Sequence, residues 1–169
     1  MSMGTVNDYY ETALFAVVKT LMRDYASKFF QDIASYIGAY YTDDEDDDIY
    51  GSELSDAGYY LRLLKDEVKE FVEGNETKLI TDLFVDEFKN MCADEDVCND
   101  ILNSSSVTQS FLDNAIRRAK ESYNIDESSK RDLAFAVLLS ELSFDEISEC
   151  LYAEIEDRYD IVGEIKYWL

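Results

Sequence analysis

The stretch that decides the fold class is residues 14–37, LFAVVKTLMRDYASKFFQDIASYI. Its large apolar residues recur at steps of three and four, at Leu14, Val17, Val18, Leu21, Tyr25, Phe29, Ile33 and Ile37. This period places them on one stripe of an α-helix. The stretch therefore predicts one long helix, or two nearly coaxial helices, ending close to Gly38.

The same helical period recurs along the rest of the chain. Apolar residues follow it in residues 61–71, 80–91, 97–102, 111–119, 133–142 and 147–155. The chain contains no proline, which suits long helices, and no alternation typical of a strand is present. We predict an all-α fold, a single compact bundle of about six to eight helices, forming one domain over residues 1–169. Residues 133–139, LAFAVLL, are apolar on nearly every side and predict a central helix.

Local signals also predict where some of these helices begin and end. Ser106 and Gln109 form a capping-box pattern ahead of one helix. Asp126 is a candidate N-cap for the helix over residues 133–142, because a carboxylate can accept from a free backbone N–H. Gly74 is expected just after the end of a helix, where a left-handed backbone is often needed.

Net charge is the strongest indication of function. The chain carries 38 Asp and Glu residues against 15 Lys and Arg residues, a net charge of −23. It is also 47% hydrophobic and 14% aromatic, so it has the composition of a folded acidic domain rather than a disordered acidic tail. Because self-repulsion of this size destabilises a folded chain, the charge predicts a basic partner protein.

Two groups of acidic residues are candidate partner-binding residues. The first is a run predicted to form a mobile loop near residues 42–52, and it comprises Asp43, Asp44, Glu45, Asp46, Asp47 and Asp48. The second is a row predicted to share sides of the penultimate helix, and it comprises Asp145, Glu146, Glu149, Glu156, Asp157 and Asp160. Few bases interrupt this row, whereas a solvated helix face usually mixes both signs.

Residues 106–131 differ from the rest of the chain because basic residues slightly outnumber acidic ones there. The basic residues in question are Arg117, Arg118, Lys120, Lys130 and Arg131. We interpret them as partners for acids on neighbouring helices rather than as a second binding surface.

The residue types argue against catalysis and against a resident cofactor. The chain has no histidine, which excludes Ser–His and Cys–His catalysis, and three cysteines alone cannot complete a four-ligand zinc site. Its six glycines are scattered rather than grouped into a phosphate-binding loop. The acidic run fails the EF-hand pattern in the registers starting at Asp44 and Asp46. We therefore predict a non-enzymatic protein without cofactor or metal.

Direct binding of nucleic acid is not expected. Residues 142–147 and 150–151 resemble the first helix of a helix-turn-helix, as in sigma-factor-like DNA-binding domains. The resemblance implies that the residues after it would face DNA. Those residues include Glu154, Glu156 and Asp157, which phosphates would repel.

The ends of the chain bear on location and assembly. No signal peptide is visible at the N-terminus, and no apolar run is long enough to cross a membrane. An odd number of cysteines fits a reducing compartment, so we expect a cytoplasmic protein of a bacterium or a host cell. The apolar residues 161–169 either pack on the bundle, which we favour, or join two protomers in a homodimer.

Three functions remain open at this point. The first is an acidic helical inhibitor that mimics DNA and occupies the nucleic-acid site of a restriction, CRISPR-type or similar nuclease. Phages and other mobile elements use such anti-restriction and anti-CRISPR proteins, an analogy of charge and helix content only. The second is an immunity protein or antitoxin that neutralises a basic toxin. The third is a scaffold or groove-binding protein in which apolar helix faces bind the partner and the charge is incidental.

Overall fold

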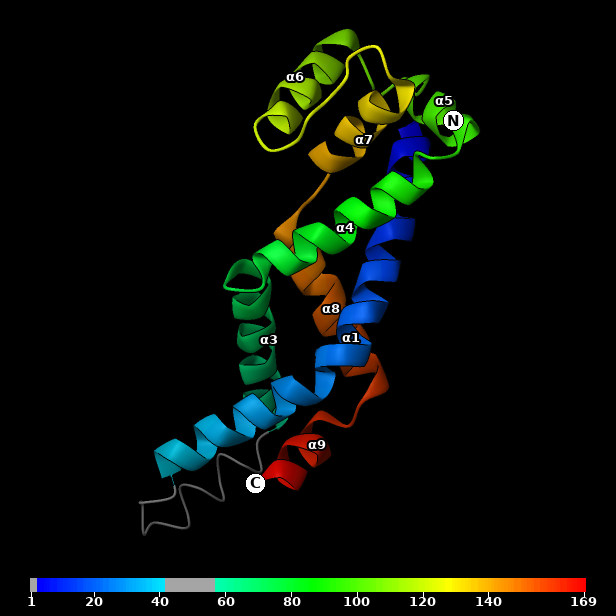
Figure 1. Cartoon of the computed structure of the whole chain (residues 1–169). Helices are drawn as coiled ribbons and strands as arrows, with labels where there is room; N and C mark the ends of the chain where they lie inside the picture. Colours follow the sequence, from blue (N-terminus) through cyan, green and yellow to red (C-terminus); the bar gives the residue numbers. More distant parts are fainter. Residues whose placement is uncertain (1–2, 42–56) are drawn as a thin grey trace. The chain divides into compact units, whose positions relative to one another are not determined.

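The computed structural model describes residues 3–41 and 57–169 (Figure 1). Every regular element in this part of the chain is a helix, and there are eight of them. They are α1 (Met3–Tyr41), α3 (Ala57–Glu73), α4 (Thr77–Met91), α5 (Glu95–Leu102), α6 (Gln109–Lys120), α7 (Lys130–Ser140), α8 (Phe144–Arg158) and α9 (Ile161–Trp168). The predicted all-α class is confirmed, and residues 14–37 lie in one helix. The loop predicted near residues 42–52 lies outside the described residues.

The described helices fall into two compact units. The first unit contains residues 3–17 and 78–143, and the second contains residues 18–41, 57–77 and 144–169. Helix α1 contributes to both, because the division falls after Val17. The assignment of residues 1–169 to one domain stays a prediction.

Helix α7 forms the centre of the first unit. It contacts both α5 and α6, and Figure 1 shows α6 and α7 side by side. All five residues from Ala134 to Leu138 are buried, whereas Leu133 and Leu139 at the two ends of the apolar run are partly exposed. The prediction of a central helix is therefore confirmed for this unit.

Helix α3 forms the centre of the second unit, where it contacts α8 and α9. Three residues on the inner side of α8, Ile147, Leu151 and Ile155, have no exposed surface. The ring of Phe71 on α3 packs against Phe29 of α1, with ring centroids 5.0 Å apart and planes at 89°. Because the apolar side of α8 is buried in this way, its opposite side carries the polar residues.

Two predicted helix starts are wrong. The N-cap of α6 is Thr108, whose hydroxyl accepts from Phe111 N at 3.1 Å, so Ser106 lies two residues before the cap. The N-cap of α7 is Ser129, and Asp126 instead accepts from the backbone N–H of Ser128 at 3.0 Å. Several residues with a side-chain oxygen precede each helix, so the sequence alone does not single out the cap.

Gly74 follows the last residue of α3 as predicted, but for a different reason. Its φ is not positive, so no left-handed backbone is present there. A Cβ at this position would clash with the backbone carbonyl oxygen of Glu70. Glycine is therefore needed because the backbone of the preceding turn approaches closely.

The central position of α7 can be tested with one substitution at two adjacent leucines. Leu138 has no exposed surface, whereas Leu139 is partly exposed. We expect Leu138→Ala to lower the free energy of unfolding by about 2–5 kcal/mol, because it leaves a cavity in a closed core. Leu139→Ala should cost clearly less, as measured by urea denaturation. Equal losses at the two positions would contradict this placement of α7.

Candidate partner-binding face of helix α8

Five acidic residues on α8 form an exposed surface that we call the acidic face. It comprises Asp145, Glu146, Glu149, Glu156 and Asp157, all of which are exposed. At about 100° per residue, Asp145, Glu149 and Glu156 lie within about 40° of one another around the helix. Glu146 and Asp157 extend the same face to an arc of about 120°. The structure therefore brings together five of the six residues predicted to form the ordered row.

The sixth predicted residue, Asp160, does not belong to this row. Helix α8 ends at Arg158, and Asp160 is the N-cap of α9, where its carboxylate accepts from Gly163 N at 3.3 Å. The sequence period of α8 continues past its true end, which is why the prediction included Asp160. This carboxylate is exposed, but it stabilises the start of α9.

Most of the acidic face has no compensating charge. No Lys or Arg in the described ranges forms an ion pair within 4.0 Å of Asp145, Glu149, Glu156 or Asp157. In contrast Glu154, which lies off this face, pairs with Arg158 at 3.2 Å. Like charges at i and i+4 destabilise a helix, so the face opposes folding.

One edge of the acidic face borders a groove between α3 and α8. The groove has a volume of about 380 Å³ and is lined by Lys65, Lys69, Asp145, Ser148, Glu149 and Tyr152. Lys65 Nζ lies 5.9 Å from the centroid of the Tyr152 ring. Burial, together with the neighbouring Glu156 carboxylate, raises the pKa of Tyr152. This edge is therefore mixed in charge, unlike the rest of the face.

The two lysines of the groove were not among the predicted site residues. They are separated from α8 by about 80 positions in the sequence, so nothing in the local pattern of α8 indicates them. The available signal was their own spacing, because Lys65 and Lys69 at i and i+4 share one side of α3.

The other candidate residues have different outcomes. The acidic run Asp43, Asp44, Glu45, Asp46, Asp47 and Asp48 lies outside the described residues. The five basic residues between positions 117 and 131 are all exposed. Within the described part of the chain their only ion pair joins Lys120 to Glu127 at 2.8 Å, in the loop that follows α6. The expectation that they pair with acids on neighbouring helices is wrong.

Some residues of the apolar C-terminus are buried, and others are exposed. Ile161 and Ile165 are buried, and α9 contacts α3, as the favoured interpretation predicted. The last three residues are exposed, with 78% of Tyr167, 43% of Trp168 and 44% of Leu169 accessible. A homodimer through these residues stays a prediction.

Comparisons with known proteins found no matching protein-family model, no matching curated protein and no matching solved structure. Among the described helices, none is both long and apolar enough to span a membrane. In the same residues, no group of three or more Cys, Asp or Glu side chains is arranged to hold a metal ion.

A second acidic cluster shows that charge destabilises this fold locally. Burial raises the pKa of Glu67 on α3, and the carboxylates of Asp32 and Glu70 raise it further. Lys28 is close by, but its Nζ forms an ion pair with Asp32 at 2.6 Å. The positive charge of Lys28 therefore compensates Asp32 more than Glu67. The folded protein thus holds Glu67 in an environment that disfavours the ionised form.

Removing the charge of Glu67 should stabilise the protein at neutral pH. The folded state binds a proton at Glu67 more readily than the unfolded state, so this penalty is present at pH 7 and disappears as the pH falls through the raised pKa. We expect Glu67→Gln to raise the free energy of unfolding by roughly 0.5 kcal/mol at pH 7, since solvent screens a half-exposed group.

The measurement is denaturant unfolding of both proteins between pH 4 and 7 (about the range in which a carboxylate titrates). Glu73→Gln on the same helix removes one negative charge from an exposed position and serves as the control. The gain at Glu67 should exceed the gain at Glu73 and should shrink as the pH falls. A constant difference across the range would contradict the assigned cause.

Proposed function

We propose that this protein is an acidic inhibitor that binds the basic nucleic-acid-binding site of a partner protein. The partner class is a restriction, CRISPR-type or similar defence nuclease, whose DNA the inhibitor would mimic. The observation that supports this proposal is the acidic face of α8. It consists of exposed carboxylates on one side of a helix, and four of the five have no ion-pair partner in the described residues.

The charge density of the face resembles that of a nucleic-acid strand. Asp145 and Asp157 lie twelve positions apart on α8, which at a rise of 1.5 Å per residue corresponds to about 18 Å of helix axis. Averaged over this length, the five carboxylates give about one charge per 4 Å, against about 3.4 Å along one DNA strand, although they form two groups, Asp145 to Glu149 and Glu156 with Asp157. A groove of Lys and Arg that accepts a phosphate backbone would therefore find a similar linear charge on α8.

The face is also held in place before any partner binds. The buried residues Ile147, Leu151 and Ile155 fix the orientation of α8 against the core of its unit. A surface that is already ordered loses little conformational entropy on association, which favours affinity. We propose that the acidic run over residues 43–48 adds a second source of charge that attracts the same basic partner.

An immunity protein or antitoxin that neutralises a basic toxin is the alternative. It would use one concentrated epitope, whereas exposed acids also occur on α4, α5 and α3, for example Asp86, Asp96 and Glu70. This spread favours the mimicry of an extended polyanion. The mixed groove beside Lys65 and Lys69 would suit a protein epitope, and competition by DNA separates the two functions.

Reversing charges on the acidic face should abolish partner binding. We expect the triple variant Glu149→Lys, Glu156→Lys and Asp157→Lys to weaken binding about a hundredfold or more, because close charge pairs across an interface contribute several kcal/mol. Helicity should be kept, since cations near the C-terminal end of α8 are favourable to its dipole. The matched control, Asp66→Lys, Glu70→Lys and Glu73→Lys, makes the same charge change at exposed positions of α3.

The measurement begins with a pull-down from a lysate of the native host at low salt and at about 0.5 M salt, where screening shortens the reach of charge to a few Å. Dissociation constants are then measured for the purified partner with wild-type protein and both triple variants, with and without duplex DNA. A basic nucleic-acid-binding partner that DNA displaces and the α8 variant no longer binds supports mimicry. A small toxin that DNA does not displace supports the alternative. If both triple variants bind the partner equally well, the acidic face is not part of the binding site.

A further inference from the structure

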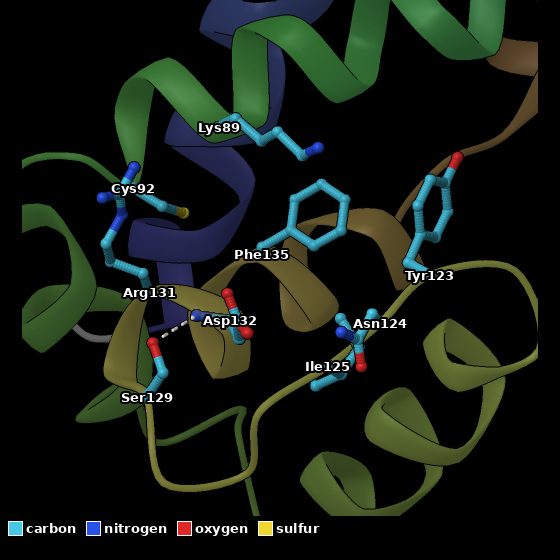
Figure 2. Close-up of a pocket in the computed structure, with 9 residues that line it drawn as sticks. All are labelled: Lys89, Cys92, Tyr123, Asn124, Ile125, Ser129, Arg131, Asp132 and Phe135. Carbon is cyan, nitrogen blue, oxygen red and sulfur yellow. Dashed lines mark hydrogen bonds between the residues drawn. The ribbon is translucent and has the colours of Figure 1, made fainter.

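A cavity of about 420 Å³ lies in the first unit, whereas the acidic face belongs to the second unit (Figure 2). The last turn of α4, the loop after α6 and the N-terminal half of α7 surround it. Its lining residues are Lys89, Cys92, Tyr123, Asn124, Ile125, Ser129, Arg131, Asp132 and Phe135. This volume is within the usual range for a small-molecule site.

One wall of the cavity is aromatic. Phe135 is buried in the centre of α7, and its ring meets that of Tyr123 at 89° with centroids 5.5 Å apart. Ile125 is buried beside them. Tyr123 is only half buried, so part of its ring borders the cavity and can contact a planar ring of a ligand.

Two cations line the same cavity, and neither forms an ion pair with another described residue. In Figure 2 the amine of Lys89 lies over the Phe135 ring, 5.8 Å from its centroid, and the Arg131 side chain extends toward Cys92. Ion pairs within 4.0 Å that involve described residues occupy Arg23, Lys28, Lys120 and Arg158, but neither Lys89 nor Arg131. The lining thus contains two cations and one carboxylate, Asp132, a net positive charge in a chain whose net charge is −23.

Asp132, the acidic residue of the lining, already forms hydrogen bonds within the protein. One carboxylate oxygen of Asp132 accepts from Asp126 N at 2.8 Å, and its own N–H donates to Ser129 Oγ, the dashed line in Figure 2. Asp132 therefore holds the loop before α7 in place. Burial raises the pKa of the Cys92 thiol to about 12, with a further contribution from Cys98, so this thiol is neutral at physiological pH.

We propose that this cavity binds a small anion that carries a planar ring. The ring lies against the wall formed by Tyr123 and Phe135, and the anionic group, a carboxylate or a phosphate, is held by Lys89 and Arg131. The Asn124 amide and the Ser129 hydroxyl supply hydrogen bonds at the rim. The neutral Cys92 thiol adds no repulsion to the bound anion.

The test is a calorimetric titration of the full chain at low salt with two probes, adenosine 5′-monophosphate and 1-naphthoate. We expect at least one probe to bind with a dissociation constant below about 1 mM. Lys89→Gln and Arg131→Gln should each weaken that binding about tenfold, and Tyr123→Leu should weaken it as well. The matched control is Arg117→Gln, which removes an exposed cation of α6 outside the cavity and should change nothing.

Recognition of the planar ring and recognition of the anionic group can be tested separately. Adenosine and inorganic phosphate should each bind more weakly than adenosine 5′-monophosphate, because each lacks one of the two recognised groups. Preference for one probe tells whether the anionic group is a phosphate or a carboxylate. The proposal is overturned if neither probe binds at about 1 mM, or if both cation variants bind as well as the wild-type protein.

This inference does not depend on the proposed inhibitor function. The triple variant Glu149→Lys, Glu156→Lys and Asp157→Lys should bind the probes as the wild-type protein does, since all three residues belong to the second unit. Lys89→Gln should in turn leave binding of a protein partner unchanged. Failure of one proposal is thereby distinguished from failure of the other.

Discussion

Burial of the apolar side of α8 against α3 is the interaction on which the acidic face depends. An isolated helix of this length is marginal in water, and adjacent carboxylates weaken it by a few tenths of a kcal/mol per pair. Fully burying Ile147, Leu151 and Ile155 contributes roughly 1.5–3 kcal/mol for each side chain. Packing therefore exceeds local repulsion by a wide margin, which allows α8 to carry a one-signed surface.

The two units distribute their charge in different ways, although the whole chain is strongly acidic. The second unit holds the acidic face and the cluster around Glu67, where burial and like charges disfavour ionisation. The first unit holds a cavity lined by Lys89 and Arg131, for which residues 3–41 and 57–169 supply no ion-pair partner. Composition alone does not show this difference.

Features set by local periodicity could be predicted from the sequence, whereas features set by tertiary contacts could not. The apolar run at residues 133–139 predicted a central helix, because a helix that is apolar on every side is recognisable from its own sequence. The caps at Thr108 and Ser129 could not be distinguished from nearby alternatives, since several residues offer the same side-chain oxygen. The groove beside Lys65 depends on which helix packs against α8, and the cavity beside Lys89 depends on the loop after α6. Each of these two sites combines residues from segments far apart in the sequence, so the pattern of a single helix does not indicate it.

The strongest argument that the acidic face has a function comes from a comparison within α8 itself. Glu154 is paired with Arg158 at i and i+4, so this helix can offset a negative charge where the sequence provides a base. Glu156 and Asp157 lie in the same last turns, where negative charge also opposes the helix dipole, and no base in the described residues pairs with them. Solubility requires only a net charge, which acids at less costly positions would supply equally well. The position of these unpaired acids at the unfavourable end of the helix is therefore the observation on which the proposed partner binding rests.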